Sequence, residues 1–261
     1  MEGFPTDPEF LSDSPETRDI EAQLMLFAHS VEAFQEPNWA YHNWEWHIKS
    51  SFAEAMRLCD EYDQKKETDQ PTVNRLVVGL AILSHDSGYS HYKTAEELES
   101  STGFESKEAY SCHIAEQTLL DMGYEQEIID YVKACIGATQ RGTECLTIES
   151  WLVRRADLFN IASNYEYFKT ATTNFRDEIA MLSGKKHIMS LGEFMCLSWP
   201  VLRDYIQDDY NLWPGDKHPL GHSKFYVNTC LNVYRLLIES GVGVTVQLTN
   251  FIKDLPSKVR S

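Results

Sequence analysis

The chain is poor in basic residues. Its 261 residues include 23 Lys and Arg against 40 Asp and Glu, which gives a formal net charge of −17. Polynucleotide binding depends on basic surfaces, so no polynucleotide partner is expected. A small anionic substrate would need a local positive field, supplied by a metal ion or by a few cations. The candidate cations are Lys107, Lys133, Arg154 and Arg155.

The sequence also lacks the patterns of a membrane or secreted protein. Its longest strongly apolar run, Val77–Leu83, is too short to span a bilayer. The first residues are acidic and include Pro5 and Pro8, unlike the basic and then apolar start of a signal peptide. Six cysteines occur, none in a Cys-x-x-Cys pair, which is typical of reduced core thiols. We expect a cytoplasmic protein without membrane contact, with residues 1–16 as a flexible leader.

Strand signals are sparse, whereas helical periodicity is frequent. Hydrophobic residues make up 43% of the chain, enough for a sizeable core. Ile48, Phe52, Ala55 and Cys59 recur at three- and four-residue steps and form one apolar helix face. The ranges expected to be helical are 17–34, 42–63, 71–85, 106–122, 125–138, 147–165, 223–240 and 245–254, with further helices opening after Thr94 and, before Pro200, at Ser190. The expected fold is all-α, with a helical domain over 17–180 and a C-terminal helical extension over 181–261 packed on the same domain.

The apolar run ends abruptly in an adjacent pair, His85 and Asp86. A carboxylate at the end of a buried run costs several kcal/mol unless something neutralises it. Asp157 lies four residues after Val153, so it also points toward an apolar side of its helix. With His47 upstream, the set comprises two imidazoles and two carboxylates. Such a mixed set suits a divalent metal ion that keeps open positions for water.

Each residue of this set also has a simpler interpretation. His47 could be a hydrogen-bonded core histidine, and Asp157 could pair with Arg154 or Arg155. The His-Asp pair could be a histidine at a helix C-terminus followed by a turn carboxylate. Gly88 is placed to end that helix in left-handed geometry, which glycine tolerates.

The order His…His-Asp…Asp along expected helices resembles the HD-domain superfamily of metal-dependent phosphohydrolases. Three flanking elements add to the resemblance: Tyr41-His-Asn before the first histidine, Glu108-Ala-Tyr-Ser111, and Ala156-Asp-Leu158. Over about 41–164 the chain looks most like the bacterial group described as predicted metal-dependent HD phosphohydrolases. The resemblance implies an HD-domain helical bundle. The metal ligands that it implies are His47, His85, Asp86 and Asp157.

One spacing departs from the family pattern. The usual order is His-Asn-x-x-His, whereas His42 and His47 lie five residues apart. Because helical residues four apart share a face, His42 is expected before the helix or on another side of it. Between the His-Asp pair and Asp157, the chain supplies His91 and His113 as further histidines. This short supply favours one metal ion over two.

The resemblance implies hydrolysis of a phosphate ester on a nucleotide or another small phosphorylated metabolite. The divalent ion would be Mn²⁺, Mg²⁺, Fe²⁺, Zn²⁺ or Ni²⁺. A leaving alkoxide needs a proton, and Glu108, His42 and His91 are the catalytic candidates by position. Tyr89 and Lys107 are the candidates for substrate binding. Glu108 could instead be a first-turn surface residue favoured by the helix dipole, and Tyr89 could simply pack in the core.

Two other functions stay open. Some proteins with this helical core hold two irons and oxidise C–H or C–P bonds with dioxygen, which would require His113 to join a second site. A non-catalytic nucleotide-binding or regulatory module would use the same ligands structurally. Glu108 and His113 lie five residues apart on one expected helix, and project about 140° apart around its axis. One of them can face the pocket, and the Glu-x-x-Ser pattern favours Glu108.

Overall fold

The computed structural model describes residues 15–32, 39–89, 95–183, 188–207, 209–217 and 221–241. This part of the chain is mostly helical and contains no β-strand beyond an isolated bridge between Lys217 and Ser223. The predicted all-α fold is therefore confirmed. Most of the predicted leader over 1–16, and the predicted helix over 245–254, lie outside the described residues.

The helices follow one another along the chain with short connections. The α-helices are α1 (Pro15–Glu32), α2 (Lys49–Lys65), α3 (Arg75–Ser84), α4 (Ala95–Thr102), α5 (Lys107–Asp121), α6 (Gln126–Gly137), α7 (Ile148–Asp157), α8 (Tyr165–Leu182), α9 (Leu191–Gln207) and α10 (Lys224–Glu239). The short helical turns are η2 (Trp44–Ile48), η3 (Ser87–Tyr89), η4 (Phe159–Ala162) and η5 (Pro214–Asp216).

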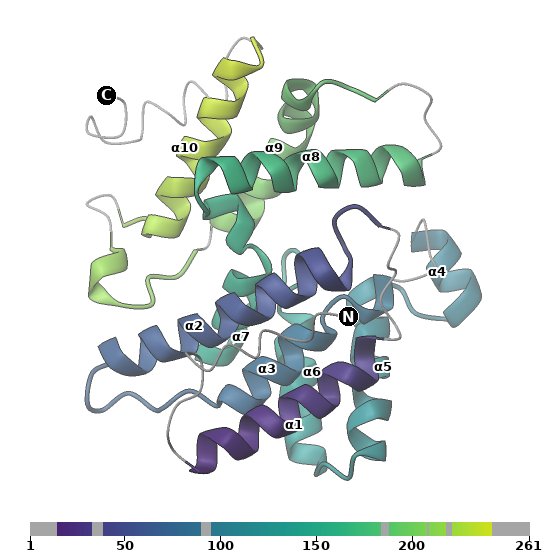
Figure 1. Cartoon of the computed structure of the whole chain (residues 1–261), viewed down its shortest axis with the longest axis vertical. Coiled ribbons are helices and arrows are strands. Elements are labelled where there is room, and N and C mark those ends of the chain that lie inside the picture. Colours follow the sequence, from purple (N-terminus) through teal and green to yellow (C-terminus); the bar gives the residue numbers. More distant parts are fainter. Residues whose placement is uncertain are drawn as a thin grey trace.

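Helix α3 lies at the centre of the larger hydrophobic cluster (Figure 1). Its residues from Val77 to Ser84 are all buried, because α1, α2, α5, α6 and α7 pack around it. A helix covered on every side is apolar all round, which explains the unbroken apolar run in the sequence. Gly79 lets α1 approach closely, since a Cβ there would lie 2.5 Å from a methyl carbon of Leu24.

Helices α8, α9 and α10 form a second hydrophobic cluster with η4, and Figure 1 shows this group above the first. Phe168 of α8, Trp199 of α9 and Val233 of α10 are buried in it. Helix α8 was not predicted from the sequence. The predicted helix over 147–165 instead ends at Asp157 and is followed by η4 before α8 begins.

Two further helix boundaries differ from the sequence expectation. Helix α3 begins at Arg75 rather than near Pro71, because the Asn74 side chain caps it by accepting a hydrogen bond from the Val77 N–H at 3.2 Å. The helix expected to open before Pro200 continues through that residue. Pro200 removes one backbone donor, and the buried side chains on either side of it hold α9 in place.

Arg155 connects α7 to the segment that follows α9. Its Nη1 donates to Asp216 Oδ2 at 2.7 Å, and its Nη2 donates to Asp209 Oδ1 at 2.7 Å. All three side chains are buried or nearly so. A buried guanidinium with two carboxylates is strongly bound to them, so this contact fixes how α7 meets the second cluster.

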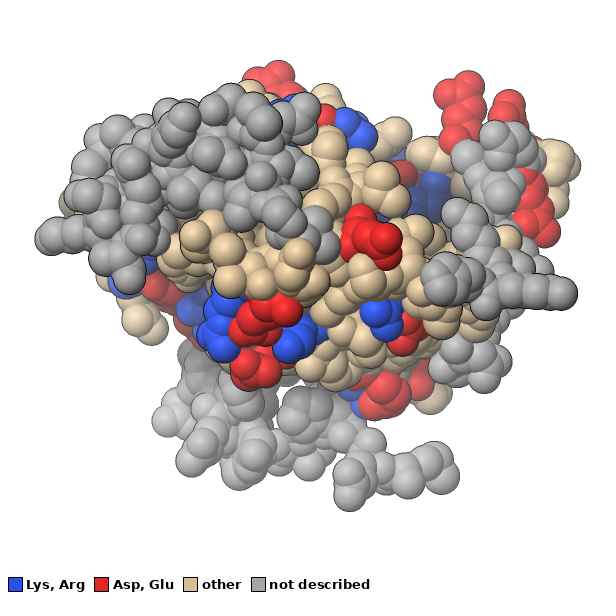
Figure 2. Space-filling model, turned by 90° about the horizontal axis from the view of Figure 1, so that it is seen from above, with Lys and Arg blue, Asp and Glu red and all other residues tan. Residues whose placement is uncertain are grey.

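Charged side chains of both signs are mixed on the face shown in Figure 2. On α8 and α10, for example, Lys169 and Arg235 both bond to the Glu239 carboxylate at 3.0 Å. Among the described helices, none is long and apolar enough to cross a bilayer.

Candidate metal centre

Four side chains from separate segments meet at one point inside the helical bundle. His47 lies in η2, His85 and Asp86 follow α3, and Asp157 ends α7. Nε2 of His47 lies 3.2 Å from Nε2 of His85, from Oδ2 of Asp86 and from Oδ1 of Asp157. Nε2 of His85 lies 3.2 Å from the same two carboxylate oxygens. The structure thus brings together the four residues expected from the sequence to bind metal.

The spacing of these atoms fits the space around one ion. Metal–ligand bonds of about 2.0–2.2 Å place neighbouring ligand atoms roughly 3.0–3.3 Å apart. Asp86 Oδ2 is buried and has no hydrogen-bond partner, which is costly for a carboxylate unless a cation lies beside it. These four residues, His47, His85, Asp86 and Asp157, could therefore hold a metal ion and are called the metal group below.

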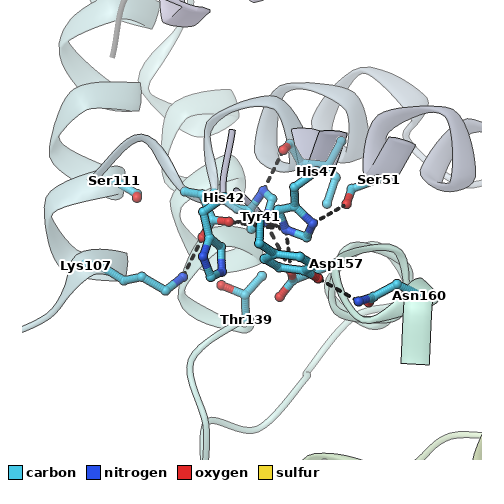
Figure 3. Close-up of polar contacts among 12 residues, drawn as sticks. Tyr41, His42, His47, Ser51, Lys107, Ser111, Thr139, Asp157 and Asn160 are labelled. Carbon is cyan, nitrogen blue, oxygen red and sulfur yellow. Dashed lines mark hydrogen bonds and ion pairs between the residues drawn. The ribbon is translucent and has the colours of Figure 1, made fainter. Parts of the chain in front are cut away.

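Contacts on the far side of each imidazole aim its Nε2 at the centre of the group, and Figure 3 shows the contact between His47 and Ser51. His85 Nδ1 lies 2.7 Å from the Ile82 carbonyl oxygen, so Nδ1–H donates there and the ring turns Nε2 inward. His47 Nδ1 lies 3.5 Å from Ser51 Oγ, four residues later. The Tyr41 ring packs against the His47 imidazole with the ring centroids 4.9 Å apart.

A π-helical turn accommodates the five-residue spacing between His42 and His47. In η2 the Ile48 N–H donates to the Asn43 carbonyl oxygen, five residues back, at 3.3 Å. The Asn43 side chain caps the turn by accepting from the Trp46 N–H at 2.8 Å. A π turn absorbs one extra residue in a helix. His42 lies just before this turn and still reaches the site, with its ring centroid 5.5 Å from that of His47.

The four groups form a network of opposite charges. Burial lowers the pKa of His85, but the carboxylates of Asp86 and Asp157 outweigh it and raise that pKa to about 10. The same carboxylates raise the pKa of His47 against the effect of burial. Burial raises the pKa of both carboxyls, but nearby positive charges outweigh it. His85 and His47 hold the pKa of Asp157 below its usual range. His85 and Lys107 do the same for the pKa of Asp86. The carboxylates and the imidazoles therefore stabilise one another's charged forms in the metal-free site.

Lys107 of α5 approaches Asp86 from the side away from the imidazoles. Its Nζ lies 2.6 Å from Asp86 Oδ1 and 3.2 Å from Glu108 Oε1. The Tyr89 ring centre is 5.4 Å from the same nitrogen. The two oxygens of Asp86 therefore face different partners. Substrate binding by Lys107 and Tyr89 stays a prediction.

The expectation that Gly88 ends a helix in left-handed geometry is wrong. Helix α3 already ends at Ser84, and Gly88 lies in η3. A Cβ on Gly88 would lie 2.3 Å from the Lys107 carbonyl oxygen and 2.8 Å from the Ser111 backbone nitrogen. The Gly88 N–H donates to Ser111 Oγ at 2.8 Å. Glycine is therefore required for close contact with α5, and this contact places Asp86 beside Lys107.

A second pair of polar side chains borders the metal group. His42 Nδ1 lies 2.5 Å from Glu178 Oε1, and Glu178 Oε2 accepts the backbone N–H groups of Tyr41 and His42 at 2.8 Å each. Glu178 is fully buried in α8. Tyr89 stacks on the His42 ring with centroids 4.2 Å apart. Glu178 is not predicted from the sequence, because no local pattern in α8 distinguishes it from the other acidic residues there.

The other predicted catalytic residues lie in different surroundings. Glu108 is buried, with 7% of its surface exposed, and lies on the side of α5 that faces the site. His113 is exposed on the other side of α5, with its ring centroid 5.0 Å from that of Phe104, and it is outside the metal group. His91 lies outside the described residues.

The two arginines before Asp157 do not pair with it, so that alternative is wrong. Arg154 Nε donates to the Ala138 carbonyl oxygen at 2.6 Å, and its Nη2 donates to the Thr143 carbonyl oxygen. Arg155 bonds to the two carboxylates beyond α9 described above. Arg154 thus holds the loop after α6, and Asp157 stays available to the metal group.

A cavity of about 600 Å³ lies between the C-terminal part of α7, the end of α9 and the loop after α6. Trp151 and Arg154 of α7 and Tyr205 of α9 line it, together with the loop over 141–145. Arg154 lies three residues before Asp157, so the two are neighbours on one helix surface. Burial raises the pKa of the Tyr205 phenol, and the negative charge of Asp157 adds a smaller increase. Tyr205 and Arg154 are therefore the lining residues with a link to Asp157, by its charge and by helical spacing respectively.

Comparison of the chain with known proteins found no matching family model, no matching curated protein and no matching solved structure.

Proposed function

We propose that this protein is a metal-dependent phosphohydrolase of the HD-domain type, acting on a phosphate ester of a nucleotide or another small metabolite. The observation that carries the proposal is the buried group of His47, His85, Asp86 and Asp157, whose inward donor atoms include the unpartnered Oδ2 of Asp86. These four residues would hold the ion. A bound divalent ion polarises a phosphoryl oxygen and lowers the pKa of a water molecule.

The proton for the leaving group comes from His42 in this proposal. Hydrolysis forms a bond from a water oxygen to phosphorus and breaks the bond from phosphorus to the leaving oxygen, which then takes up a proton. Because Glu178 holds His42 Nδ1, Nε2 on the opposite edge of the ring is free to donate. Glu178 acts as a positioning residue, since it orients the ring without reaching the substrate. Tyr89 restricts the ring from one face.

The local charge suits an anionic substrate although the whole chain is acidic. Lys107 neutralises one oxygen of Asp86, and Arg154 has no ion-pair partner among the described residues. The cavity that Arg154 lines would offer the ring of Trp151 and the hydroxyl of Tyr205 to the part of the substrate that does not react. An aromatic wall with a few polar groups is common in pockets that bind nucleosides and similar metabolites.

The first experiment is elemental analysis of the purified chain combined with a screen of phosphomonoesters and nucleotides. We expect turnover after a divalent ion is added, and loss of turnover in excess chelator, because the ion activates the water. Unchanged turnover after confirmed metal removal contradicts the proposal. A metal-loaded protein that binds a nucleotide and never converts it supports the non-catalytic alternative.

The proton donor is tested by two substitutions next to the metal group. His42→Asn should lower kcat by about 10²–10⁴-fold, the usual contribution of a general acid, and should leave the metal content unchanged. Glu178→Gln should lower kcat less than His42→Asn does, because the imidazole stays in place but loses the carboxylate that orients it. The matched control is His113→Gln, an exposed histidine on α5, which should keep both metal and rate. A rate unchanged in His42→Asn rules out this donor.

A further inference from the structure

The ammonium of Lys107 is enclosed by two carboxylates at the edge of the metal group. Its Nζ lies 2.6 Å from Asp86 Oδ1 and 3.2 Å from Glu108 Oε1, and 27% of the side chain is exposed. The Tyr89 ring, 5.4 Å from Nζ, adds an aromatic face, which attracts cations. These groups together define a position for a cation next to the metal group, and Lys107 fills it.

We propose that Lys107 takes the place of a second metal ion and thereby keeps the centre mononuclear. The inference rests on the metal centre of the proposed function, and it is independent of hydrolysis. A carboxylate that bridges two ions contacts one ion with each oxygen. Asp86 Oδ2 faces His47 and His85, whereas Oδ1 already accepts the hydrogen bond from Lys107. A second ion at Oδ1 would have to displace the ammonium against like-charge repulsion.

The potential metal-binding side chains around Lys107 are too few for a second ion. Within the described part of the chain, no second cluster of His, Cys, Asp and Glu donors could hold an ion as the side chains stand. His113, which a second site would need, packs against Phe104 on the exposed side of α5. Glu108 is the other carboxylate that faces this position, and it contacts Lys107.

A lysine in this position also has a consequence for the substrate. An ammonium has three N–H donors; Asp86 accepts one of them, and Glu108 forms an ion pair at 3.2 Å. A remaining donor would be available to a phosphoryl oxygen bound beside the metal group. Lys107 thus supplies a fixed positive charge to the substrate, where a dinuclear centre would supply a second ion.

Metal stoichiometry tests the proposal. Metal-free wild-type protein, Lys107→Gln and Lys107→Ala are titrated with Mn²⁺ in equilibrium dialysis, with circular dichroism as the check on folding. We expect one equivalent in the wild type. Both variants should gain a second, weaker equivalent, because Asp86 Oδ1 and Glu108 lose their cation. The matched control is Lys133→Gln, which removes a lysine paired with Glu116 at 2.8 Å and should stay at one equivalent.

Three outcomes overturn the proposal in different ways. Two equivalents in the wild type overturn it and leave the metal centre standing. One equivalent in the folded Lys107 variants shows that the lysine does not exclude a second ion. No bound Mn²⁺ in the wild type overturns both this inference and the proposed metal centre. If the variants fail to fold, the electron paramagnetic resonance spectrum of wild-type protein with excess Mn²⁺ decides, since a spin-coupled pair contradicts a mononuclear centre.

Discussion

At the scale of single residues, the site depends most on Asp86. Its Oδ2 faces two imidazoles without a hydrogen bond, and its Oδ1 accepts from Lys107. One carboxylate therefore links the metal group to α5. A buried carboxylate needs a cation beside it. In the metal-free fold the two imidazoles, each 3.2 Å from Oδ2, meet this need, and a metal ion at the centre of the group could take their place.

Asp86→Asn should abolish stoichiometric metal binding and leave the helices in place. The amide keeps the volume of the side chain but loses the negative charge that a divalent ion requires. Metal analysis after dialysis and far-ultraviolet circular dichroism measure the two effects. The matched control is Asp209→Asn, which changes another buried carboxylate that bonds to Arg155 and lies outside the metal group. A full equivalent of metal on Asp86→Asn would show that the ligand assignment is wrong.

The pH dependence of metal binding follows from the raised pKa values of the imidazoles. His85 has a pKa of about 10 in the metal-free fold against an ordinary value of 6.5, and the pKa of His47 is raised too. Charged His85 thus stabilises the metal-free fold fully below pH 6.5, and this contribution is lost as the pH rises toward 10. A metal ion must displace these protons, so its apparent affinity should increase with pH over the same window.

For each proton displaced, the affinity should rise by up to about tenfold per pH unit. Calorimetric titration with Mn²⁺ in buffers of different ionisation enthalpy counts the protons directly. We expect net proton release near neutral pH. Zero release would mean that both imidazoles are already neutral in the metal-free protein.

At the scale of elements, the contact between η3 and α5 sets the geometry of the site. The Gly88 N–H bonds to Ser111 Oγ, and the glycine lies directly against the α5 backbone at Lys107. A polar dipeptide at the end of α3 is thereby held beside the first turn of α5. The contact also explains the Glu-x-x-Ser pattern, since Glu108 and Ser111 lie three residues apart and both face η3.

Gly88→Ala should destabilise the fold by about 1–3 kcal/mol, because the new Cβ meets backbone atoms that cannot move independently. Its nearest contacts would be 2.3 Å and 2.8 Å. The substitution should also weaken metal binding, since η3 must shift and carry Asp86 with it. Urea unfolding and Mn²⁺ titration measure the two effects.

The control for this substitution is Gly137→Ala, because no atom lies within 4 Å of the Cβ that it adds at the end of α6. In a helix, alanine is favoured over glycine by roughly 0.5–1 kcal/mol, so this variant should be slightly more stable than wild type. Equal stability for both variants would contradict the tight contact at Gly88.

At the scale of the whole molecule, an ion in the metal group would cross-link segments that are far apart in the chain. His47 and Asp157 are 110 residues apart, and His85 and Asp157 are 72 residues apart. These residues come from η2, the end of α3 and the end of α7, which belong to the larger hydrophobic cluster or its edge. An ion that binds the folded chain and not the unfolded chain would therefore stabilise the whole fold.

Saturating metal should raise the Tm of the wild type. At a free ion concentration of one hundred times Kd, the free energy of unfolding increases by about 2.7 kcal/mol. For a chain of this size, each kcal/mol corresponds to roughly 2–4 °C in Tm. Differential scanning calorimetry with and without chelator measures the shift, and Asp86→Asn should show none. An equal shift in wild type and Asp86→Asn would place the stabilising ion elsewhere.

Local patterns in the sequence were sufficient for the all-α fold, whereas the grouped donors were indicated only by the joint order of His and Asp residues along several helices. Helical periodicity depends on nearest neighbours along the chain, and the run before His85 is apolar all round because α3 is covered on every side. A carboxylate after such a run requires a partner wherever the helix packs. Asp157 was found in the same way, from apolar residues at helical spacing around it.

Tertiary structure alone decided which other side chains meet those donors. Glu178 contacts His42, 136 residues away in the sequence, because α8 packs against the segment 41–46. Nothing in the local sequence of α8 indicates this packing. Lys107 is the hydrogen-bond partner of Asp86 Oδ1, because Gly88 lets η3 lie directly against the backbone of α5. Helical periodicity in the sequence does not indicate this contact. Local sequence patterns report on residues close together in the chain, whereas these contacts join residues far apart in the sequence and depend on how the helices pack.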